Sequence, residues 1–167
     1  MDADEVWDGS AVSGAPSKGE RVVVGIIDTG VNTDHPSFAG VGPVDGYAHQ
    51  NPRGRWYGDC AATPPPLPTS KCNNKLIGLY DFTSSTVGSE DDVGHGSHTA
   101  STVAGNVVDA TIYAPTATFG PKRISGVAPH ANIISYKACR AAEFTTCLLY
   151  TSPSPRDRTR SRMPSSA

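Results

Sequence analysis

Two side chains in this sequence have the types and settings that acid–base chemistry requires. Asp28 ends the apolar run RVVVGIID, and His95 stands between two glycines in the segment GHGSH. A carboxylate that ends such a run is costly to bury unless it is paired or hydrogen-bonded. An imidazole beside it can act as a general base. We therefore predict a carboxyl oxygen of Asp28 within about 2.6 to 3.2 Å of His95 Nδ1 and a raised His95 pKa.

Each of these residues also has a simpler interpretation. Asp28 could form a turn by accepting hydrogen bonds from the main chain of Thr29 and Gly30. His95 could be a helix-start residue, or it could bind a metal together with His98, because positions three apart share a helix face. No acidic or sulfur ligand stands at a convincing spacing for such a metal site.

The surrounding segments predict an open α/β sheet. Residues 21–28 and 131–137 are apolar without strict alternation, which is typical of strands buried on both faces, and residues 75–80 are a third strand candidate. Residues 94–105 carry small side chains and end before Asn, which favours a helix packed closely on the sheet. Residues 40–74 are dense in Gly, Pro and Asn and predict a long surface loop. In such sheets reactive groups gather at the carboxyl ends of the strands.

The composition excludes several classes of protein. The 167 residues fit one domain, with a formal charge of -2 and a mean hydropathy of -0.32. No run approaches the roughly 20 apolar residues that a membrane span needs. A nucleic-acid-binding surface would show clustered Lys and Arg. We therefore expect neither a membrane nor a nucleic acid as partner.

The composition changes near the C-terminus. The segment 147–167 contains four arginines and three prolines but no glycine. Its beginning, CLLYTSPSPRD, resembles an in-frame translation of a transposase adapter used in sequencing libraries, and its end, SRMPSSA, resembles the flow-cell end of the same adapter. We therefore expect residues 1–146 to form the domain and 147–167 to be an artefactual tail. On this interpretation the natural protein continues after about Thr146 with a different sequence. A disordered Ser/Pro/Arg tail is the alternative.

Three segments together resemble the subtilisin-like serine proteases (subtilases, peptidase S8), most closely their secreted subgroup shared by plants and bacteria. They are GIIDTGVNTDHPSF, GHGSHTASTVAGN and SGVAPHANIISYKAC, in the family's order and spacing. The resemblance implies a partial doubly wound, mostly parallel sheet of the subtilisin-like fold, with residues 1–146 as the N-terminal part of the peptidase domain. It matches Asp28 to the catalytic aspartate, His95 to the catalytic histidine and His98 to a structural position.

The resemblance also shows what the chain lacks. The family's nucleophile lies in a Gly-Thr-Ser motif, which does not occur here, and the oxyanion asparagine is missing too. Ser97 stands where the family more often has Thr. In the triad the carboxylate orients the imidazole, and the imidazole takes the serine proton. The resemblance therefore implies a serine endopeptidase with polypeptide substrates, whereas this chain is expected to be inactive.

Further expectations follow from the family. No cofactor is expected, although calcium is possible and no calcium site can be assigned. The first nine residues are polar and acidic rather than a signal sequence. The resemblance implies an extracellular protein whose leader and inhibitory propeptide lay upstream and were lost.

The cysteines support an oxidising compartment. Cys60 and Cys72 flank a proline-rich loop, and a disulfide between them would contribute roughly 3 kcal/mol; two free thiols are the alternative. Cys139 would then pair with Cys147 or with a downstream residue. Disulfides are typical of secreted proteins.

Two other functions stay open at this point. The segment IIDTG also matches pepsin-like aspartic proteases, in which two carboxylates share a proton, but a second such motif is missing. The chain could also belong to a non-catalytic relative of the proteases that only binds peptides. A Gly-Thr-Ser motif in the downstream gene would distinguish the enzyme from this binder.

Overall fold

The computed structural model describes residues 3–11, 14–61 and 71–140. The predicted tail, the last residues of the predicted domain and Cys147, which the sequence offers as a partner of Cys139, lie outside these ranges. Among the helices of the described residues, none has the length and hydropathy needed to cross a membrane.

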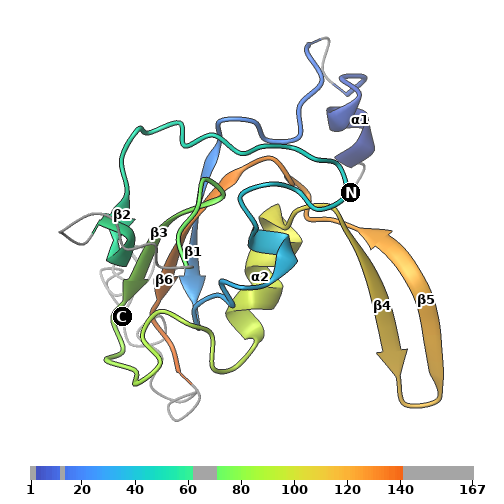
Figure 1. The fold of residues 1–167 in the computed structure, drawn as a ribbon. Coiled ribbons are helices and arrows are strands. Elements are labelled where there is room, and N and C mark those ends of the chain that lie inside the picture. Colours follow the sequence, from blue (N-terminus) through green and yellow to red (C-terminus); the bar gives the residue numbers. More distant parts are fainter. Residues whose placement is uncertain (1–2, 12–13, 62–70, 141–167) are drawn as a thin grey trace, which may run out of the picture.

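A parallel sheet of four strands organises the molecule, in the order β1-β6-β3-β2 (Figure 1). The predicted α/β fold with a mostly parallel sheet is confirmed, and the three predicted strands lie close to their expected bounds. The register places Asp28, Lys137 and Asp81 side by side at the carboxyl edge. The strands are β1 Val23–Asp28, β2 Tyr57–Gly58, β3 Leu76–Asp81 and β6 Asn132–Lys137.

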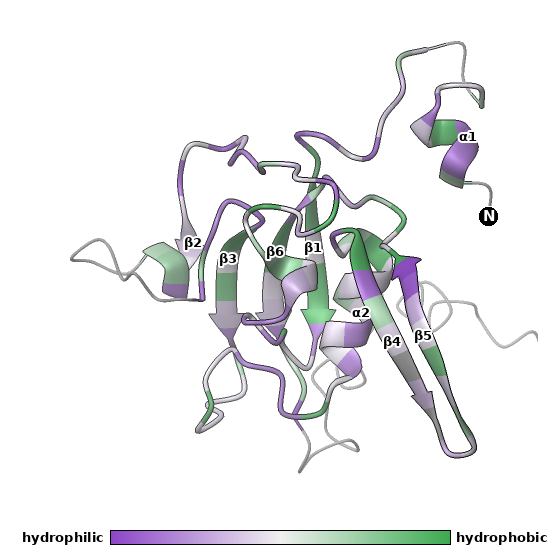
Figure 2. Ribbon diagram, turned by 45° about the vertical axis from the view of Figure 1, so that its right-hand side comes forward, coloured by the Kyte–Doolittle hydropathy of each residue, from purple (hydrophilic) through white to green (hydrophobic). Residues whose placement is uncertain are grey.

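Helix α2, His95–Ala104, covers one face of this sheet and contacts β1 and β6. The predicted helix is therefore confirmed. Its small side chains explain the close packing, because Ala100 and Ala104 are fully buried against the core that Ile26, Leu79 and Ile133 supply from the strands. The sheet is hydrophobic along its strands and turns hydrophilic at their carboxyl ends (Figure 2). The chemistry-bearing residues therefore lie where the buried layer stops.

The opposite face of the sheet carries an aromatic patch. Successive side chains of a strand point to opposite faces, so the neighbours of the buried Ile26 and Leu79, namely Ile27 and Tyr80, point away from α2. The rings of Tyr80 and Tyr136 stack with centroids 5.0 Å apart, and Phe82 stacks on Tyr80 at 5.9 Å. We call Ile27, Tyr80, Phe82 and Tyr136 the aromatic face.

A β-hairpin, β4 Val108–Ala114 and β5 Ala117–Ile124, projects from the sheet (Figures 1 and 2). The sequence patterns do not predict it. Every residue of β5 is exposed, so this strand buries no apolar face that would produce a clear alternation. Short elements complete the fold, namely α1 Ala3–Trp7 and the 3-10 turns Pro36–Phe38 and Asp59–Ala61.

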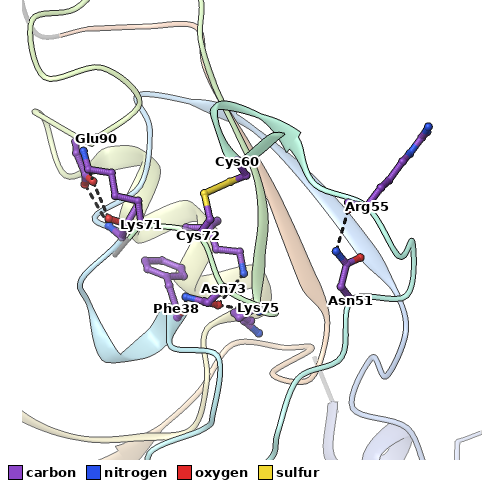
Figure 3. The surroundings of a disulfide bond; sticks show 11 residues. Phe38, Asn51, Arg55, Cys60, Lys71, Cys72, Asn73, Lys75 and Glu90 are labelled. Atoms are coloured by element: carbon purple, nitrogen blue, oxygen red, sulfur yellow. Dashed lines mark hydrogen bonds and ion pairs between the residues drawn. A yellow bond between two sulfur atoms is a disulfide. The ribbon is translucent and has the colours of Figure 1, made fainter. Parts of the chain in front are cut away.

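The predicted disulfide between Cys60 and Cys72 is confirmed, with Cα atoms 5.8 Å apart. It packs beside Phe38 and near the ion pair of Lys71 and Glu90 (Figure 3). The described part of the predicted surface loop, residues 40–61 and 71–74, is more structured than expected. This segment supplies strand β2, and its His49 is only 2% exposed.

One lysine is buried at the amino edge of the sheet. Lys75 has no exposed surface, and its Nζ donates to the carbonyl oxygens of Pro129 and Ala131 at 2.7 Å each. Burial lowers the pKa of Lys75 to about 7 because carbonyl dipoles replace only part of the lost hydration.

Candidate active site

Asp28 and His95 meet at the carboxyl edge of the sheet. Asp28 is the last residue of β1 and His95 the first of α2, 67 positions later. His95 Nδ1 lies 2.8 Å from Oδ1 and 2.9 Å from Oδ2 of Asp28. The predicted contact is therefore present, although the catalytic roles of both residues remain predictions.

The two partners differ in exposure and charge. The Asp28 side chain is 12% exposed, whereas that of His95 is 65% exposed. The hydrogen bond to Asp28 and the charge of this carboxylate raise the pKa of His95, and Asp91 adds to the effect. The main-chain N–H of Thr29 donates to Asp28 Oδ1 at 2.8 Å. A carboxylate held from two sides in this way can fix one tautomer and one orientation of the imidazole.

Glycines allow the two backbones to approach. A Cβ on Gly96 would lie 2.2 Å from the carbonyl oxygen of Gly30, and a Cβ on Gly30 would lie 2.6 Å from the carbonyl oxygen of Ser89. Gly94, the N-cap of α2, has a φ of 92°, which L side chains rarely adopt. The start of α2 therefore rests directly on the loop after Asp28.

A pocket of about 300 Å³ lies beside the start of α2 and is lined partly by His35, Ser97 and His98. His98 is exposed, and its carbonyl oxygen accepts hydrogen bonds from the hydroxyls of Ser101 and Thr102. Within residues 3–11, 14–61 and 71–140, no group of three or more His, Cys, Asp or Glu could hold a metal ion. The alternative of a metal held by His95 and His98 therefore gains no support.

A model of the subtilase family, peptidase S8, matches residues 19–152. The chain belongs to the subtilase family. The family is one of serine-type peptidases, which agrees with the resemblance of the three sequence segments.

Named relatives of this subtilase chain come from Arabidopsis thaliana. It is 35% identical to subtilisin-like protease SBT2.4 over 151 residues, which is 80% of this chain and 17% of that protein. It is 37% identical to subtilisin-like protease SBT1.4, covering 72% of this chain and 16% of that protein. It is 39% identical to subtilisin-like protease SBT4.12, covering 70% and 14%. The chain thus spans less than a fifth of the length of these relatives.

The serines near His95 in this subtilase chain have other partners. Ser97 Oγ donates to Asp91 at 2.7 Å, and Ser101 Oγ donates to the carbonyl oxygen of His98 at 3.0 Å. Neither hydroxyl is bonded to the imidazole. The partner of Asp28 is an imidazole, whereas an aspartic protease pairs its aspartate with a second carboxylate. The geometry therefore favours the serine-protease interpretation over the aspartic one.

The sequence patterns did not single out Asp91. Its carboxylate accepts hydrogen bonds from Thr29, Val93, Gly94 and Ser97. The available signal was an acidic residue three positions before the N-cap of a helix whose N-cap residue is a glycine. Its link to Thr29, 62 positions away, could not be read from a local pattern.

Proposed function

We propose that the protein to which this chain belongs is a serine endopeptidase that cleaves polypeptides. The observation that carries the proposal is the bond from His95 Nδ1 to Asp28 in a subtilase sequence. Asp28 and His95 supply the acid and the base of an Asp-His-Ser triad. The serine and the oxyanion asparagine lie in sequence that this chain does not contain.

The chemistry follows from the geometry of the pair. The carboxylate of Asp28 accepts a hydrogen bond from the Nδ1–H of His95, so the lone pair of the neutral ring is on Nε2. Nε2 then takes the proton of the serine hydroxyl as the oxygen attacks the scissile carbonyl, and the imidazolium gives this proton to the leaving amine. Asp28 stays ionised and stabilises the imidazolium.

Recovering the downstream gene tests the proposal. A longer clone should contain a Gly-Thr-Ser motif, and its product should hydrolyse a fluorogenic peptide in a manner sensitive to phenylmethylsulfonyl fluoride. Asp28→Asn should lower kcat by about 10⁴-fold because the imidazole is no longer held in the correct tautomer. An inactive full-length product without the motif would overturn the proposal in favour of a non-catalytic peptide-binding relative.

The 167-residue chain itself is proposed to be inactive because it lacks the nucleophile. Purified chain should release no fluorophore above the buffer rate. Inhibitor-sensitive hydrolysis by this chain would contradict this part of the proposal.

An extracellular location is part of the proposal. The disulfide between Cys60 and Cys72 supports it, because such bonds persist in oxidising compartments. A polypeptide substrate and an upstream inhibitory propeptide are the proposed partners. Expression of the full gene with an epitope tag, followed by assay of the medium, tests the location; retention in the cytosol would contradict it.

A further inference from the structure

One carboxylate near the proposed acid–base pair accepts more hydrogen bonds than its neighbours do. Asp91 Oδ1 accepts from Thr29 Oγ1 at 2.8 Å, from Val93 N at 3.0 Å and from Gly94 N at 2.8 Å. Its Oδ2 accepts from both N and Oγ of Ser97, at 2.7 Å each. Five donors from two separate segments thus converge on Asp91.

These donors belong to the immediate neighbours of the acid–base pair. Thr29 follows Asp28, and Gly94 precedes His95. The hydroxyl of Thr29 also accepts the N–H of Gly96 at 2.8 Å. These two hydrogen bonds, from Gly96 to Thr29 and from Thr29 to Asp91, therefore join the loop after Asp28 to the first turn of α2.

Asp91 also acts in place of an N-cap side chain. The N-cap residue Gly94 has no side chain to satisfy the first N–H groups of α2. Asp91 accepts the N–H groups of Gly94 and Ser97, and its negative charge is favourable at a helix N-terminus. Burial raises the pKa of Asp91, but hydrogen bonds from Ser97, Gly94 and Thr29 outweigh burial and keep this pKa below its ordinary value. The carboxylate therefore stays charged at neutral pH.

The position of His95 depends on this main-chain arrangement. Its side chain is 65% exposed, so packing contributes little to its orientation. The distance from Nδ1 to Asp28 is then determined mainly by where α2 begins relative to the end of β1. A misplacement of about 1 Å can cost an enzyme about 100-fold in rate.

We propose that Asp91 is a positioning residue that joins the loop after Asp28 to the start of α2 and so holds His95 within hydrogen-bonding distance of Asp28. The inference rests on the proposed function, because it concerns the same acid–base pair. Ser97 is the uncharged partner of Asp91 in this arrangement. Its hydroxyl donates to Asp91 and accepts a hydrogen bond from the N–H of Asn32 at 2.9 Å.

The first experiment uses the chain itself, labelled with ¹⁵N-histidine and studied by NMR. In Asp91→Asn and in Ser97→Ala, we expect the downfield Nδ1–H resonance of His95 to be lost and its pKa to fall. Ser97→Thr keeps the hydroxyl and should restore both. Asp34→Asn removes the charge of an exposed residue of the same loop and should change neither.

The variants Ser97→Ala and Ser97→Thr separate an effect of Asp91 on the position of His95 from an effect of its charge on the His95 pKa. If Asp91 acted through its charge alone, Asp91→Asn would lower the His95 pKa without removing the Nδ1–H resonance. Ser97→Ala leaves the charge in place, so an effect of this variant on the resonance must come from geometry. If Ser97→Ala leaves resonance and pKa unchanged, the positioning role is wrong.

Asp28→Asn distinguishes failure of this inference from failure of the proposed function. If that variant leaves the His95 pKa unchanged, the acid–base pair itself is wrong. If it lowers the pKa while Asp91→Asn and Ser97→Ala do not, only the positioning role is wrong.

The second experiment uses the full-length protein and does not depend on NMR of the chain. Ser97→Ala should lower kcat by up to about 100-fold at unchanged KM, and Ser97→Thr should recover it. A merely structural role would reduce the yield of folded enzyme but leave kcat per active site, measured by active-site titration, unchanged. That result would overturn the inference.

Discussion

At the scale of single residues, burial and hydrogen bonding determine which groups carry charge. His95 keeps an exposed ring whose pKa is raised by the hydrogen bond to Asp28 and by its charge. Lys75 is the opposite case, since its ammonium is buried and its pKa falls to about 7. The first effect favours the protonated imidazole, whereas the second favours the neutral amine and lowers the stability of the fold where Lys75 stays protonated.

Lys75 should give the chain a distinct pH dependence of stability. Between pH 7 and 10.5 the unfolded chain keeps a proton that folded Lys75 has released. Stability therefore rises with pH across this window, with a slope of up to about 1.4 kcal/mol per pH unit. Urea unfolding at several pH values should show the rise in the natural chain and its loss in Lys75→Met. An equal slope in both proteins would contradict the assignment.

At the scale of elements, the contact between α2 and the loop after β1 is made by backbone. Gly96→Ala places a Cβ 2.2 Å from the carbonyl oxygen of Gly30. Because the Cβ is fixed to the backbone of α2 and the atoms that it meets are backbone too, the helix must shift. Such a shift typically lowers stability by about 1 to 3 kcal/mol. We expect a lower thermal midpoint and a lower His95 pKa. Gly120→Ala is the control, because nothing lies within 4 Å of its added Cβ. Equal thermal midpoints and equal His95 pKa values in the two variants would contradict the prediction.

The disulfide should stabilise the segment around β2. Replacing Cys60 and Cys72 by serine opens the loop that the disulfide closes between residues 12 positions apart. The chain-entropy model gives a decrease of about 3 kcal/mol in the free energy of unfolding. Denaturant unfolding measures this loss. The single variant Cys60→Ser should be as unstable as the double variant, because either change removes the bond. Additive losses would show that the side chains stabilise by some other means.

At the scale of the whole molecule, the two faces of the sheet differ in how far the described residues cover them. Helix α2 packs on the first face, while the aromatic face is partly exposed: Ile27 is 55% and Phe82 58% exposed, and Tyr80 and Tyr136 are half-buried. Contiguous apolar surface of this kind promotes association.

We expect the chain to bind a hydrophobic dye and to self-associate in sedimentation velocity. Ile27→Thr combined with Phe82→Ser should reduce both signals. Tyr113→Ser on the hairpin is the control, because it removes an exposed ring that is not part of the aromatic face. If Tyr113→Ser reduces dye binding and the double variant does not, the association is made by the hairpin instead of the aromatic face.

The sequence alone predicted strands β1, β3 and β6, helix α2 and the contact between Asp28 and His95. The apolar runs that end in Asp28 and Lys137 and the small residues of α2 are local signals, because burial of a parallel sheet imposes them on consecutive residues. The disulfide could be proposed because its cysteines lie only 12 positions apart. The hairpin was missed because its exposed strand residues carry no burial pattern.

Only the tertiary structure decided how the pair is held. The link from Asp91 to Thr29 joins residues 62 positions apart, and the close approach of Gly96 to Gly30 joins residues 66 positions apart. Hydrogen bonds and steric contacts of this kind depend on distances in space, which the order of residues does not encode locally. The sequence therefore predicted the contact between Asp28 and His95, and the packing of α2 against the end of β1 placed Asp91 within hydrogen-bonding distance of the segments that carry both residues.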